Sequence, residues 1–95
     1  MSAPVTIGDR SVPRLPRGVR LRYDERRERW VILAPERLFL PDPVALEVLK
    51  RCDGRAELRA IVDDLAKTFE AERAVIDRDV KALLQDLADK GVISA

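Results

Sequence analysis

Carboxylates are the commonest side chains in this sequence that could take part in catalysis, because a close pair can divide acid and base roles between them. Asp63 and Asp64 are adjacent, and Asp77 and Asp79 are two residues apart. On a helix, side chains at these spacings point in different directions and do not meet. We therefore interpret both pairs as solvated helix surface and not as an acid and base pair.

Cys52 is the only cysteine, and the sequence contains no histidine. The commonest general base and the commonest metal ligand are therefore missing. A reactive thiol needs exposure and a basic neighbourhood. Cys52 falls on the apolar stripe of a predicted helix, with Lys50 and Arg51 turned away from it, so we interpret it as a small buried core residue. We expect no metal site.

The sequence also lacks residues suited to bind a nucleotide or to act as a catalytic serine. The glycines are isolated, and none opens the strand-to-helix turn of a phosphate-binding loop. The serines have no partner base; they are Ser2, Ser11 and Ser94. The sequence therefore predicts neither catalytic activity nor a bound cofactor.

The composition indicates one small globular domain. The chain has 95 residues, of which 46% are hydrophobic and 37% are charged. A chain of this length can bury enough surface to form only one hydrophobic core. No apolar run is long enough for a membrane span, and the N-terminus lacks the pattern of a secretory signal. A single cysteine agrees with a reducing compartment. We expect a cytoplasmic protein with no membrane partner.

Charge divides the chain into two unequal halves. Residues 1–40 carry nine arginines and five acids, net +4, whereas residues 41–95 carry nine bases and twelve acids, net −3, so the whole is +1. A chain this close to neutral is a poor non-specific binder of nucleic acid. The basic half could favour an acidic peptide or partner surface, or it could simply be solvated.

The elements that would position any site begin after a proline-containing stretch. Residues 1–17 lack periodicity, and we expect an extended N-terminal arm followed by a domain at 18–95. From Gly18 apolar and polar residues alternate as in a half-buried strand. The polar run 24–29 reverses the chain, and Trp30–Ala34 is apolar enough to be the central strand of three.

The third predicted strand, Arg37–Leu40, is brief, apolar and bounded by Pro35 and Pro41. Proline cannot donate to a strand ladder, so this pattern is typical of an edge strand with unpaired backbone groups. Such an edge can receive a peptide as an additional strand.

Helical periodicity follows Pro41. Three amphipathic stripes predict three helices, the first capped by Asp42 and the last ended by Gly91. Their apolar residues are Ala45, Val48, Leu49 and Cys52; Leu58, Ile61, Val62, Leu65 and Phe69; and Ile76, Val80, Leu83, Leu84 and Leu87. The fold class is therefore α+β, a three-stranded antiparallel sheet followed by a three-helix bundle, similar to a winged helix-turn-helix.

This layout leaves a DNA-binding regulator as an alternative function. Its recognition helix would be the third predicted helix, which carries more acids than bases. The acids are Asp77, Asp79, Asp86 and Asp89, and the bases are Arg78, Lys81 and Lys90. Such a surface repels phosphate. The arginines of the first hairpin could still form a basic wing, so the alternative stays open.

The sequence resembles the D-protein family of pyrroloquinoline quinone (PQQ) biosynthesis, PqqD-like peptide chaperones that are RiPP recognition elements. The likeness covers about residues 13–93. It rests on Arg17-Gly18-Val19, Tyr23, Leu33-Ala34-Pro35-Glu36-Arg37 and Asp53-Gly54, in this order and spacing.

The resemblance implies a non-catalytic chaperone. Members of this family bind a ribosomally made precursor peptide (PqqA-like) and present it to a radical S-adenosylmethionine (radical SAM) enzyme (PqqE-like), which joins a Glu and a Tyr side chain within it. The peptide would add as a strand beside Arg37, Leu38, Phe39 and Leu40, over a wall drawn from Asp77, Lys81 and Leu84. An exposed edge can also pair with its twin, so a monomer and a strand-exchanged homodimer both remain open.

Overall fold

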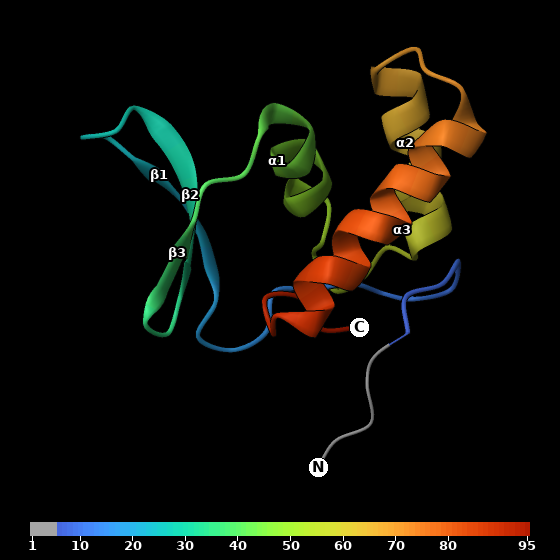
Figure 1. The fold of residues 1–95 in the computed structure, drawn as a ribbon. Helices are drawn as coiled ribbons and strands as arrows, with labels where there is room; N and C mark the ends of the chain where they lie inside the picture. Colours follow the sequence, from blue (N-terminus) through green and yellow to red (C-terminus); the bar gives the residue numbers. More distant parts are fainter. Residues whose placement is uncertain (1–5) are drawn as a thin grey trace.

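The computed structural model describes residues 6–95 and shows a sheet at one end of the molecule with all three helices on one side of it (Figure 1). The strands are β1 (Arg20–Asp24), β2 (Arg29–Ala34) and β3 (Arg37–Phe39), and the helices are α1 (Pro43–Lys50), α2 (Leu58–Thr68) and α3 (Arg73–Asp89). The predicted fold class is confirmed.

The sheet is antiparallel in the order β1-β2-β3, so β2 is central as predicted and β3 is an edge strand. A two-residue loop joins β2 to β3, because Ala34 is the register partner of Arg37. Within that loop Pro35 fixes its own φ and Glu36 has a φ of 60°, which fits a type II turn. The tight turn fixes the register of β3 and hence which of its groups face outward.

The predicted helix termini are confirmed at both ends of the bundle. Asp42 caps α1, its Oδ1 accepting a hydrogen bond from the backbone N–H of Ala45 at 2.7 Å, and Pro43 follows at the first helical position. After α3, Gly91 adopts a φ of 76°. The chain then folds back, and the N–H of Val92 donates to the carbonyl of Leu87 at 2.8 Å.

Helix α2 is shorter than its sequence pattern predicts. The apolar stripe that begins at Leu58 includes Phe69, but α2 ends at Thr68 after 11 residues. Phe69 is the C-cap and remains 42% exposed. Glu70 then has a φ of 49°, which no helix can continue through.

One core closes between the inner face of the sheet and the helices, in agreement with the predicted apolar stripes. Phe39 and Leu21 from the sheet pack against it at its margin. Its buried members are Ile7, Val19, Ile32, Val48, Leu49, Cys52, Leu58, Ile61, Val62, Leu65, Val80, Leu84, Leu87, Val92 and Ile93.

The described part of the predicted N-terminal arm is docked on the helices. Ile7 is buried in the core, and its N–H donates to the side-chain carbonyl of Gln85 at 2.9 Å. Arg14 and Ser94 exchange two backbone hydrogen bonds, at 2.8 and 2.9 Å. Residues 7–17, hereafter the N-terminal segment, therefore brace α3 and the C-terminus. Residues 1–5 of the predicted arm lie outside the described residues.

Candidate functional site

The free edge of β3 is the first component of the candidate site. β3 has β2 on one side and no strand neighbour on the other among residues 6–95. In a two-residue hairpin the residues flanking the loop exchange both hydrogen bonds, and the next pair exchanges none. Since Ala34 and Arg37 flank the loop, Leu38 directs its N–H and carbonyl away from β2. The edge therefore offers a donor and an acceptor at Leu38.

An apolar groove runs beside this edge. Phe39 and Leu40 form its β3 side, Leu49 lies on α1, and Leu83 and Leu87 form the α3 side, enclosing about 220 Å³. Leu40 is 49% exposed, so part of this apolar surface is in contact with water. A peptide lying along β3 would bury it.

The groove continues into a second apolar hollow of about 200 Å³ between the three helices. Asp42, Ala45 and Leu83 line both, so the two are contiguous. Val44 and Phe69 stand at the mouth of the second hollow, 53% and 42% exposed. The early end of α2 leaves Phe69 exposed there.

The four predicted β3-side residues do not share one face. Cross-strand pairing puts Phe39 opposite Ile32 on the core side of the sheet, and Leu38 opposite Leu33 on the outer side. Phe39 and Leu40 line the groove, whereas Leu38 contributes backbone groups to the edge and directs its side chain to the outer face. Arg37 is exposed at the start of the strand.

The three residues predicted on α3 do not line the groove. Leu84 is 0% exposed and belongs to the core. Lys81 instead holds the N-terminal segment, with its Nζ 2.7 Å from Asp9 Oδ1 and 3.0 Å from Asp77 Oδ2. The hydrogen bonds that Lys81 donates to Asp9 and then to Asp77 raise its pKa.

Leu83 and Leu87 form the groove wall in their place. Successive residues of a helix are 100° apart, so residues four apart share a face, and Asp77 and Lys81 lie about a third of a turn away from it. The sequence pattern identified Leu83 and Leu87 as apolar but gave no signal to separate them from the core positions. The same holds for Phe69 at the second hollow, whereas Val44 lies outside the predicted stripes.

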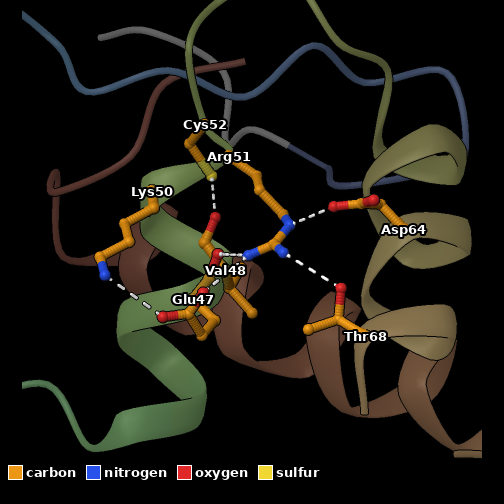
Figure 2. Close-up of polar contacts among 7 residues, drawn as sticks. All are labelled: Glu47, Val48, Lys50, Arg51, Cys52, Asp64 and Thr68. Atoms are coloured by element: carbon orange, nitrogen blue, oxygen red, sulfur yellow. Dashed lines mark hydrogen bonds and ion pairs between the residues drawn. The ribbon is translucent and has the colours of Figure 1, made fainter. Parts of the chain in front are cut away.

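Cys52 and Asp64 lie in structural contacts around the C-terminal end of α1 (Figure 2). The Cys52 thiol donates to the carbonyl of Val48 at 3.3 Å, and burial raises its pKa to about 12, so it stays protonated at neutral pH. Arg51 bridges α1 and α2, with its Nε 2.6 Å from Asp64 Oδ2. Asp63 pairs with Arg73. Both aspartates, expected to be only solvated, are ion-paired.

Residues 6–95 hold no cluster of side chains suited to bind a metal ion. No helix in that part of the chain is long and apolar enough to cross a membrane.

A winged helix-turn-helix-like domain with a free edge strand beside an apolar groove is the class that fold and site define. Residues 29–93 match the family described as Coenzyme PQQ synthesis protein D (PqqD). The chain belongs to this family. A relative from Rhodopseudomonas palustris (strain BisB5), named PqqA binding protein, is 53% identical over 93 residues, covering 98% of this chain and 91% of the relative.

Two solved structures share the fold. The solution NMR structure of the PqqD truncation of Methylobacterium extorquens PqqCD, described as a functional and stand-alone RiPP recognition element, is 46% identical with a TM-score of 0.82, covering 97% of this chain and 98% of that one. The crystal structure of PqqD from Xanthomonas campestris is 41% identical with a TM-score of 0.60, covering 95% and 100%.

Proposed function

We propose that this chain is a peptide chaperone that binds a PqqA-like precursor peptide as a fourth strand on β3. The observation that carries the proposal is the free β3 edge at Leu38 beside the apolar groove, in a member of a family whose relatives are named for binding PqqA. Main-chain hydrogen bonds along an edge hold any extended peptide, and pockets for side chains supply the selection.

Energetics require both parts of the site. Each new ladder hydrogen bond contributes about 1 kcal/mol net, so the few that β3 can form fall short of the roughly 8 kcal/mol of micromolar binding. Each apolar side chain that becomes fully buried contributes about 1.5–3 kcal/mol. Peptide side chains packing against Leu40, Leu83 and Leu87 supply the remainder. The hollow by Val44 and Phe69 accepts a further apolar anchor.

The chaperone acts without catalysis, in the cytoplasm, and presents the peptide to a radical SAM enzyme that joins its Glu and Tyr side chains. Its surface supports this assignment over the DNA-binding alternative, because α3 contributes its apolar face to core and groove and exposes mainly ion-paired acids. The chain binds the peptide as a monomer, since a strand-exchanged homodimer would occupy the same edge.

Calorimetric titration of the chain with a PqqA-like precursor peptide tests the proposal. We expect saturable one-to-one binding in the micromolar range. A scrambled peptide of the same composition is the control and should give no heat. The absence of heat and of any spectral change with the true peptide at high micromolar concentration would contradict the assignment.

A further inference from the structure

Most arginines of the sheet half have no carboxylate partner among residues 6–95, unlike most bases of the helices. Among the described residues, seven of the nine basic side chains after residue 40 form ion pairs. Of the nine before it, Arg27 alone does so, with Asp24 at 2.6 Å. This region therefore presents a positive charge that the chain does not neutralise itself.

Strand register gathers several of these arginines on the outer face of the sheet, away from the helices. Arg20 is paired with Leu33, which is paired in turn with Leu38, and Arg22 is paired with Val31. These residues share one face, because pairs opposite one another across a sheet point the same way. No helix covers this face in Figure 1.

The outer face combines this charge with apolar surface. A depression of about 400 Å³ lies on this face. The carboxylate of Asp24 at its edge is engaged by Arg27. Its lining residues are Arg22, Tyr23, Asp24, Glu25, Arg26, Val31 and Leu33. Leu38 beside it is 42% exposed. We call Arg20, Arg22, Arg26, Leu33 and Leu38 the outer patch; Val31 lies beneath it and is only 2% exposed.

We propose that the outer patch is a docking surface for a partner protein that carries clustered carboxylates. Unpaired guanidinium groups around an apolar floor complement a surface that is acidic at its rim and apolar at its centre. This surface differs from the peptide groove, which lies between β3 and α3 on the other side of the sheet. The chain can then hold peptide and partner at once.

Two other occupants fit less well. Exposed Leu38 and the apolar floor gain nothing from a phosphate backbone, which argues against nucleic acid. A second copy of the chain would have to offer free carboxylates. Those of its helices are largely engaged already, since Asp63, Asp64, Asp77, Asp79 and Asp86 all form ion pairs within the chain.

The test uses a PqqE-like radical SAM enzyme as probe, a choice that rests on the proposed function. The variant R22E/R26E reverses two charges of the outer patch. The control R10E/R55E makes the same change in net charge at exposed arginines away from the sheet, neither of which has an ion pair among the described residues. Circular dichroism checks that both variants fold.

We expect the enzyme's association rate constant to fall about tenfold in R22E/R26E at low salt and to stay within twofold in R10E/R55E. Wild-type affinity for the enzyme should weaken as salt rises. The affinity for the precursor peptide should be the same in both variants as in the wild type. A wild-type chain that does not bind the peptide would contradict the proposed function, independently of the docking proposal.

Three results would overturn the docking proposal. The first is enzyme binding that is absent, insensitive to salt, or lost equally in the two double variants. The second is a wild-type homodimer, seen by sedimentation velocity, that R22E/R26E dissociates. The third is duplex DNA binding, seen by fluorescence anisotropy, that the same variant abolishes.

Discussion

The sheet and the helical bundle satisfy their polar groups in different ways. In the bundle, side-chain carboxylates and bases are matched within the chain, as where Arg51 joins α1 to Asp64 of α2. In the sheet, the backbone edge at Leu38 and the arginines of the outer patch have no partner among the described residues. The bundle thus neutralises most of its charged side chains internally, and the sheet carries the unpaired groups that are available for binding.

The largest effect should come from the bundle, where Leu84→Ala removes a 0% exposed core side chain. We expect the free energy of unfolding to fall by about 2–5 kcal/mol, because the cavity cannot collapse fully. Urea denaturation measures the change. Leu83→Ala on the groove wall is the control and should lose less. Equal losses would show that α3 is oriented differently.

Leu38→Pro tests the sheet side of the comparison. Proline removes the outward N–H at Leu38 without removing a hydrogen bond between β2 and β3, since that pair exchanges none. Peptide affinity should fall about tenfold, corresponding to about 1.4 kcal/mol, with the helical circular dichroism signal retained. Unchanged affinity would mean that the peptide does not pair with this edge.

Leu40→Ala should have a smaller effect on the same binding. Leu40 is 49% exposed and lines the groove, so its truncation removes only a partial apolar contact. We expect a loss of about fivefold in peptide affinity by calorimetry, about 1 kcal/mol. Val75→Ala, at a 39% exposed position outside the groove, is the matched control. A similar loss of affinity in both variants would contradict the role of the groove in peptide binding.

The smallest effect concerns pH and the matched charges of the bundle. Hydrogen bonds from Arg51, then Lys50, hold the pKa of Glu47 below its ordinary value of 4.5. Its contribution to stability is therefore complete above that value and is lost as pH falls through the lower folded pKa. Thermal melts of Glu47→Gln and the wild type should differ above this window and converge below it. A constant difference in melting temperature would contradict the assignment.

The sequence predicts the scaffold well because its signals are local. Asp42 and Pro43 specify the start of α1 and Gly91 the end of α3, and the proline-bounded run at Arg37 specifies an edge strand. Each signal depends on residues within one or two turns. The observed strand order and helix order follow from them.

The groove wall could not be predicted in the same way. Apolar residues occur on two adjoining faces of α3, and tertiary packing, including that of the N-terminal segment, decides which of them faces β3. Lys81 and Asp77 turn toward Asp9, which places Leu83 and Leu87 at the groove. The docking of residues 7–17 could not be predicted from the sequence either, because an extended segment held by backbone hydrogen bonds has no periodic pattern.

Hydrogen exchange of individual backbone amides, followed by NMR with and without the precursor peptide, tests the central claim most directly. The amides of Arg37 and Phe39 pair with β2 and should be protected in both states. The amide of Leu38 should exchange freely in the unbound chain and become protected only with peptide. Saturating peptide that leaves Leu38 unprotected would contradict strand addition at β3.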